Sequence, residues 1–227
     1  MTAVASPTSA TTAATRVSSR QALTHTHTLT LTLTGIAFAV LFIASLVFSG
    51  LAGSATYPSP FDADKVTEAY FADNGGVVVG MSVLQLLSVV PLAAFVLALT
   101  RRAGAGLARA SGLCAAAGLA ACALIGLAIP VLDASGDTLH TLHHLTFMAG
   151  GPAHVPFLGI LVGASALVLR ASAPRWTTAL GFVSAGLALL SVLSFASESV
   201  MLLLPLGRFT AILWIVVTAI RAARLRK

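Results

Sequence analysis

Long apolar blocks separated by short polar connectors make up most of this chain. Each block contains about 18 or more residues, and about 20 residues of α-helix cross the hydrocarbon core of a bilayer. The pattern therefore predicts an all-α integral membrane protein that folds as a six-transmembrane-helix bundle. The predicted spans cover residues 35–53, 77–99, 111–131, 152–169, 177–197 and 201–220.

The charges of the connectors predict how these spans are oriented. Lysine and arginine in short loops favour the cytoplasmic side of a membrane. Basic residues gather before the first span, in the second and fourth connectors and after the last span, whereas all seven acidic residues lie in the other three connectors. Only Lys65 and Arg208 break this pattern. We therefore expect a multi-pass protein of the plasma (inner) membrane with both termini in the cytoplasm.

The first block has an alternative interpretation as a cleaved signal peptide, with Gly53-Ser54-Ala55 as the cleavage site. Its apolar run, residues 35–53, is longer than the roughly 7–15 residues typical of such peptides, which favours a retained span. Cleavage would leave the orientation of the other five spans unchanged.

The two ends of the chain differ from the apolar domain of residues 35–221. Residues 1–34 are rich in Ala, Ser and Thr, a composition typical of a disordered, low-complexity tail. Within them, Thr24–Thr34 alternates polar and apolar residues, which alone favours a strand, but its second half can extend the first helix. We interpret His25 and His27 as tail residues, and residues 222–227 as a basic cytoplasmic tail.

Two outer connectors predict short amphipathic helices. In the first, Ser59 is a candidate N-cap, Pro60 suits the first helical position, and Asn74-Gly75 is a natural stop. The third connector carries Asp137 and three histidines on one side of a helical turn, with leucines opposite, and Gly150-Gly151-Pro152 is expected to end this helix before the fourth span.

The histidine-rich connector is also the candidate metal site. His140 and His144 are four residues apart, a spacing at which two imidazoles on one helix can share a zinc ion. Asp137 could add a ligand or orient a histidine, and His154 could fold back toward the pair. The competing interpretation is a polar helix face at the membrane surface. Because histidines outside the tail occupy only this segment, a haem held by histidines of two helices is not expected, and a histidine–methionine pair with Met81 or Met201 is the remaining haem alternative. A divalent metal is the cofactor that the pattern suggests.

Arg208 is the second candidate, because it lies inside the sixth apolar block. A charge in hydrocarbon costs at least about 2.5–3.5 kcal/mol on insertion scales, so it should face protein or water. We predict an ion pair with Glu198 at the outer end of the fifth span, and the alternative is that Arg208 extends to the outer interface. Gln85 and Ser88 could add a polar seam, which would suit a small transporter or channel-like subunit.

Small residues at four-residue spacing predict close helix contacts, either within one chain or with a second copy of the chain or a membrane partner. The stripes include Gly118 and Gly126 on the third span and Gly159 and Gly163 on the fourth.

Composition excludes some functions. The chain is 57% hydrophobic and 9% charged, which fits contact with a lipid bilayer. The formal net charge of +6 could suggest nucleic acid, but the basic residues form no face and are not interleaved with aromatic residues. We also find no phosphate-binding glycine loop, nucleophile elbow or paired carboxylates within a span, so an enzyme is not favoured.

The six spans, the segment DADKVTEAYFADN and the segment LPLGRFTAILW together resemble small six-span membrane proteins of actinobacterial type whose function is unassigned. The resemblance covers residues 35 to 221 and implies a helical bundle in the plasma membrane, without site residues. Our first hypothesis is a non-enzymatic membrane protein with a structural or partner-binding role. The transporter and the metal-binding or redox protein are the alternatives.

Overall fold

The protein is all-helical in its computed structural model. The backbone is described for residues 8–101, 105–195 and 200–224, and the side chains from residue 26 onward in those ranges, Phe195 excepted. Across these residues no strand is present, which confirms the predicted fold class. The elements are α1 (Thr8–Ala52), α2 (Asp64–Leu99), α3 (Gly106–Val131), α4 (Gly136–Met148), the π-helical turn η1 (Ala149–Ala153), α5 (His154–Leu169), α6 (Arg175–Leu190), the 3-10 turn η2 (Ser191–Phe195) and α7 (Leu203–Arg224).

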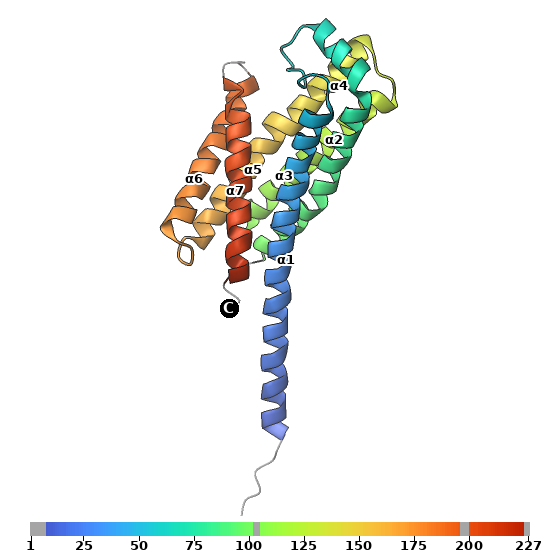
Figure 1. Ribbon diagram of the computed structural model, residues 1–227. Coiled ribbons are helices and arrows are strands. Elements are labelled where there is room, and N and C mark those ends of the chain that lie inside the picture. Colours follow the sequence, from blue (N-terminus) through green and yellow to red (C-terminus); the bar gives the residue numbers. More distant parts are fainter. Residues whose placement is uncertain (1–7, 102–104, 196–199, 225–227) are drawn as a thin grey trace, which may run out of the picture.

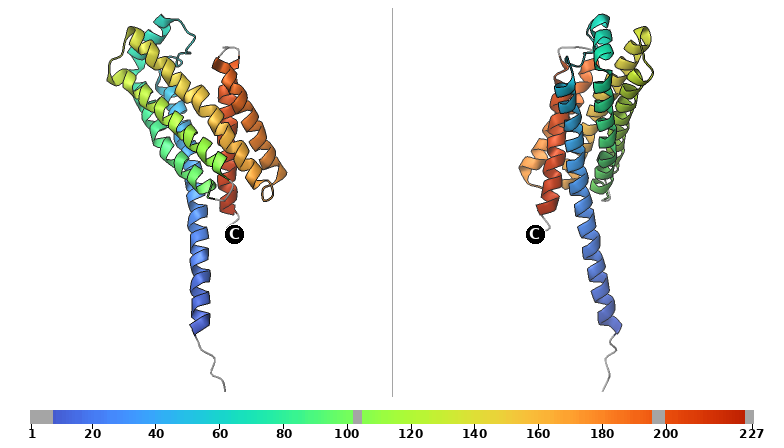
Figure 2. Two further views of the ribbon diagram at one scale, coloured as in Figure 1. Left: turned by 180° about the vertical axis from the view of Figure 1, so that it is seen from behind. Right: turned by 45° about the vertical axis from the view of Figure 1, so that its right-hand side comes forward.

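Six helical stretches are long and apolar enough to cross a membrane, in agreement with the predicted number of spans. They overlap the six predicted apolar blocks. The first five begin earlier than predicted, as in Asp64–Leu99 and Gly136–Leu169, and the last begins at Leu203 rather than at residue 201. In Figure 1 the helices run roughly side by side, with α1 next to α7 and α5 crossing the bundle. The start of α1 and the end of α7 lie at the same end of the bundle, and the α1–α2 and α3–α4 connectors lie at the other end (Figures 1 and 2).

Large side chains from five helices fill the centre of the bundle. Phe38, Phe95, Leu119, Leu158 and Trp214 are at most 1% exposed. The outside carries the opposite pattern, because many large aliphatic side chains point away from the bundle. Leu33, Val40, Leu51 and Val90 are among them, with exposures of 58%, 59%, 83% and 72%. Such an apolar belt suits contact with lipid chains rather than with water.

The small-residue stripes form close contacts between helices of the same chain. A Cβ atom at Gly118 would lie 3.3 Å from the Cα of His154, and one at Gly159 would lie 2.5 Å from the Cβ of Ala188. Gly126 faces Ser82, and Gly163 faces Ala185. The faces that we considered for an oligomer or partner are therefore occupied by neighbouring helices of the same chain.

The threonine-rich segment is helical, where we expected a disordered tail over residues 1–34. Helix α1 begins at Thr8, and the hydroxyls of Thr30, Thr32 and Thr34 each donate to the carbonyl four residues earlier. These bonds satisfy the polar groups inside the helix, so the alternating pattern does not require a strand. His27 is no tail residue, since its Nε2 lies 2.8 Å from Ala98 O in α2.

The predicted short outer helices are continuous with the spans that follow them. Helix α2 begins at Asp64, not at Ser59, whose hydroxyl instead accepts from Phe61 N. Asn74 has non-helical torsion angles, φ −120° and ψ 20°, so two helical segments of α2 meet at a kink where the sequence predicted a stop. Likewise α4 runs through the turn η1 into α5, although Gly150-Gly151-Pro152 was expected to end it.

Candidate functional site

Arg208 points into the bundle from the second turn of α7. Its Nη2 donates to the carbonyl oxygen of Gly150 in η1, and its guanidinium carbon lies 5.3 Å from the centre of the Phe42 ring in α1. The Nε atom is buried and has no partner among the described residues. Arg208 is thus held between α7, η1 and α1.

The π-helical turn explains why a carbonyl is free to accept from Arg208. His154 N–H donates to Gly151 O, three residues back, instead of closing an α-helical bond to Gly150. Pro152 within the turn has no N–H to donate, which leaves the Met148 carbonyl, one turn earlier, without its α-helical donor. Gly150 also lies against α3, because a Cβ atom there would be only 2.5 Å from Cys122 Sγ. The AGGPA sequence therefore both exposes the acceptor and lets η1 approach α3.

A cavity of about 400 Å³ adjoins Arg208 at the end of the bundle that holds the α1–α2 connector. We call it the outer cavity. Its wall combines apolar side chains of α1, α3 and α7 with polar ones from α2, α4 and the connector. The residues used below are Phe42, Leu46, Tyr57, Gln85, Leu119, Cys122, His143, Thr146, Leu204 and Arg208.

Hydrogen-bond donors dominate the polar part of this wall. The Tyr57 hydroxyl is buried without a partner among the described residues, and burial, followed by Cys122 and Tyr70, raises the pKa of its phenol. The phenol therefore stays protonated and able to donate at neutral pH. Gln85 accepts a weak bond from Cys122 Sγ at 3.8 Å, and its side-chain amide nitrogen is a further donor.

His143 holds the connector over the outer cavity. Its Nε2 lies 3.3 Å from Pro58 O, and its ring centre is 5.6 Å from those of both Tyr57 and Phe71. The sequence placed this histidine only on a polar helix face, and the metal hypothesis left it out. Its burial could not be deduced from spacing, because its partners come from a connector 85 residues earlier.

The four predicted metal ligands lie in different surroundings. His140 Nδ1 is 3.5 Å from Asp64 Oδ1, and its Nε2 is 3.4 Å from Glu68 Oε1, both in α2. His154 is fully buried, with Nδ1 2.7 Å from Ala115 O. Asp137 and His144 are exposed. In the part of the chain that the structure describes, no three His, Cys, Asp or Glu side chains are grouped to hold a metal, and metal binding stays a prediction.

The other polar candidates of the predicted spans also lie in different surroundings. Gln85 lines the outer cavity beside Arg208, as the polar-path hypothesis expected. Ser88 is fully buried and donates to the backbone oxygen of Gln85 at 2.6 Å, so it is not part of the cavity wall. Glu198, the predicted partner of Arg208, lies outside the described residues.

Comparison with known proteins adds no family to this picture. No family model matches the chain, and no curated protein or solved structure matches it.

Proposed function

We propose that this chain is a non-enzymatic, multi-pass plasma-membrane protein that binds a small organic anion in the outer cavity. The observation that carries the proposal is the Arg208 guanidinium, which lies beside a cavity whose described wall has no acidic side chain. The orientation inferred from the basic connectors would open this cavity toward the outer side of the membrane.

The charge of Arg208 explains why the ligand should be an anion. A guanidinium carries five N–H donors and stays protonated in proteins. Its described contacts are one carbonyl oxygen and the face of the Phe42 ring, and neither neutralises the charge. A carboxylate or phosphate ester can accept two parallel bonds from a guanidinium, which makes such groups the best-matched partners. The phenol of Tyr57 and the amide of Gln85 supply further donors.

The rest of the wall is apolar and favours a ligand that has an apolar portion. Phe42, Leu46, Leu119 and Leu204 line the outer cavity together with the polar groups. The volume of about 400 Å³ falls within the roughly 300–1,000 Å³ of pockets that enclose a whole small molecule. A short aliphatic chain that ends in a carboxylate or a phosphate satisfies both parts of the wall.

Binding fits this structure better than the function of an open channel. The centre of the bundle is packed with Phe38, Phe95, Leu158 and Trp214, all at most 1% exposed. Passage across the membrane would require these side chains to move apart.

The test is equilibrium binding of radiolabelled hexanoate and hexyl phosphate to the full-length chain in lipid nanodiscs, with empty nanodiscs as the correction for partitioning. We expect saturable binding that hexanol does not displace. Arg208→Gln should weaken it about tenfold or more, because a hydrogen bond to a charged group contributes about 1.5–3 kcal/mol. Tyr57→Phe should weaken it less. Arg175→Gln, an exposed charge at the other end, should leave it unchanged.

Two outcomes would contradict the proposal. In the first, the wild type binds neither probe but the Glu198→Gln variant binds one of them. Glu198 would then be the partner that neutralises Arg208, as the sequence suggested. The other is equal binding by the wild type and Arg208→Gln. Thermal unfolding of Arg208→Gln at an unchanged or higher temperature would show that the variant folds, since an unpaired buried charge is destabilising.

A further inference from the structure

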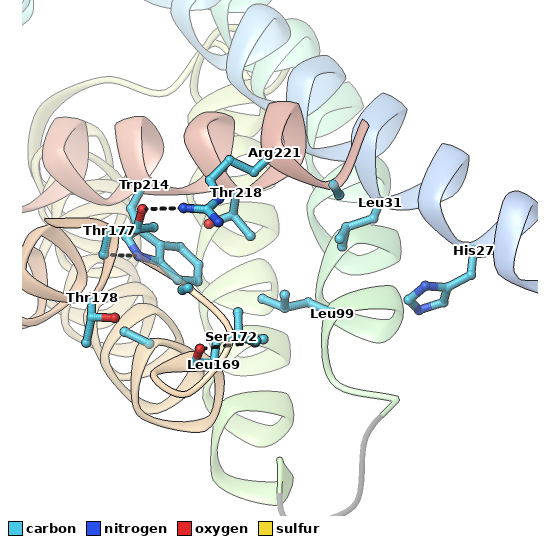
Figure 3. A pocket seen from close by; sticks show the side chains of 13 residues that line it. His27, Leu31, Leu99, Leu169, Ser172, Thr177, Thr178, Trp214, Thr218 and Arg221 are labelled. Carbon is cyan, nitrogen blue, oxygen red and sulfur yellow. Dashed lines mark hydrogen bonds between the residues drawn. The ribbon is translucent and has the colours of Figure 1, made fainter. Parts of the chain in front are cut away.

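A second cleft lies at the opposite end of the bundle, between α1, the α5–α6 turn and α7. It has a volume of about 210 Å³, and we call it the basic-end cleft. Figure 3 shows its two sides: Leu31 and Leu99 lie on one side, and the Trp214 ring lies on the other together with Thr177, Thr218 and Arg221. None of the residues that line it is acidic.

The polar side of the cleft is pre-arranged around Arg221. Its Nη1 donates to Thr177 Oγ1 at 3.1 Å, and Thr177 O in turn accepts from Trp214 Nε1 at 3.0 Å (Figure 3). These bonds hold the guanidinium at the cleft rather than in solvent. The hydroxyls of Thr178 and Thr218 also line the cleft and are buried without a partner among the described residues.

The described charges around the cleft have one sign. Arg170 and Arg175 lie at the α5–α6 turn and Arg224 ends α7, whereas the described acidic residues lie in the α1–α2 and α3–α4 connectors or near the starts of α2 and α4. Trp176, which is 57% exposed, follows Arg175 directly, and exposed tryptophan is typical of the membrane–water boundary. The cleft therefore lies at headgroup depth in a region of positive charge.

We propose that the basic-end cleft binds the headgroup of an anionic phospholipid. Its volume is below the roughly 300–1,000 Å³ of pockets that enclose a whole small molecule, so it can take a phosphate and adjoining glycerol but not the acyl chains. The chains would lie along the apolar exterior, where Leu167 and Ile220 are 49% and 39% exposed. Basic pockets between helices at the cytoplasmic side bind anionic headgroups in this way. This inference does not depend on the ligand of the outer cavity.

The experiment measures retained lipid by native mass spectrometry after full-length protein in detergent is mixed with equal amounts of phosphatidylglycerol and phosphatidylcholine. We expect the wild type to retain phosphatidylglycerol preferentially. Arg221→Gln should lower this preference about fivefold, the equivalent of about 1 kcal/mol for one basic residue near the headgroups. Arg224→Gln removes a charge from the same turn without touching the cleft, and it should keep most of the preference.

A second measurement separates the lipid from a free anion and from misfolding. Phosphatidylglycerol should raise the thermal unfolding temperature of the wild type above that in phosphatidylcholine, and 10-fold excess inorganic phosphate should not. The inference is overturned if inorganic phosphate has the same effect, if the two lipids are retained equally, or if Arg221→Gln and Arg224→Gln behave alike. Arg221→Lys keeps the charge and should restore part of the preference, which a merely misfolded variant would not.

Discussion

Arg208 illustrates how far a single residue could be interpreted from the sequence. A charge inside an apolar block must find a partner, and this argument holds whatever the fold. The partner itself was not deducible, because the oxygen that accepts from Arg208 belongs to Gly150, 58 residues earlier in the chain. A backbone carbonyl has no signature in a sequence pattern. The nearby AGGPA segment was interpreted as a helix end, although it forms the turn that frees this oxygen.

Gly150 gives a prediction at the scale of one residue. Gly150→Ala should destabilise the protein by about 1–3 kcal/mol, because its Cβ atom would overlap Cys122 Sγ and force η1 away from α3. Thermal unfolding in detergent measures the effect. The same substitution in a Cys122→Ala background should cost less, since the sulfur is the nearest obstacle. Gly76→Ala is the matched control, because a Cβ atom at Gly76 meets nothing within 4 Å. Equal losses at Gly150 and Gly76 would contradict the packing argument.

For the histidines, the sequence did not predict which side chain faces inward. Four-residue spacing put His140 and His144 on adjacent turns, but their helix rotates His140 toward Asp64 and Glu68 in α2 and leaves His144 exposed. The histidine that reaches the outer cavity is His143. Which of several neighbouring residues faces inward depends on the rotation of α4 about its axis. That rotation is set by the packing of His143 and Leu139 against Tyr57 and Phe71.

At the scale of an element, periodicity identified the spans but misjudged their beginnings. The alternating threonines of α1 satisfy their hydroxyls on their own helix, so a pattern of period two is compatible with a helix here. At the start of α2 and α4, polar and apolar residues share one helix with the span that follows. The ends of a membrane helix project beyond the hydrocarbon region, where polar residues are no obstacle to its continuation.

Asn74 gives a prediction at the scale of α2. Its Oδ1 accepts from Ser54 N at 2.9 Å and Ser54 Oγ at 3.1 Å, and its Nδ2 donates to Tyr70 O at 3.0 Å. These bonds tie the α1–α2 connector to the bend. Asn74→Ala should therefore destabilise the protein by about 1–3 kcal/mol in thermal unfolding, because it removes three hydrogen bonds that each contribute about 0.5–1.5 kcal/mol. Asp73→Ala, at an exposed neighbouring position, should change little. No difference between the two variants would mean that these bonds do not hold the connector.

On the scale of the whole molecule, the outer cavity and the basic-end cleft lie at opposite ends of the bundle, and both are lined by α7. Arg208 lines the outer cavity and Arg221 lines the basic-end cleft. Between them Ala211, Trp214 and Ile215 are at most 1% exposed and belong to the packed centre. The two hollows are thus separate sites, and substitutions in one should leave binding at the other intact.

The orientation in the membrane gives a prediction for the whole chain. A reporter enzyme that is active only outside the cytoplasm should be inactive when inserted after residue 105 or after the C-terminus, and active when inserted after residue 135. The reason is the concentration of arginines at the first two positions and of acidic residues around the third. Protein levels measured by immunoblot are the control. Activity at residue 105 would reverse the assignment of the outer cavity.

The sequence by itself determined the fold class, the number of spans and an expected orientation. These follow from local properties, because each apolar block is long enough to cross lipid alone and each connector carries its own charge. Only the tertiary structure decided which polar groups meet: Arg208 with Gly150, His143 with Pro58, and Arg221 with Thr177. Those contacts join residues far apart in the chain. They depend on the depth and rotation of helices against one another, which side-chain packing sets and no local pattern records.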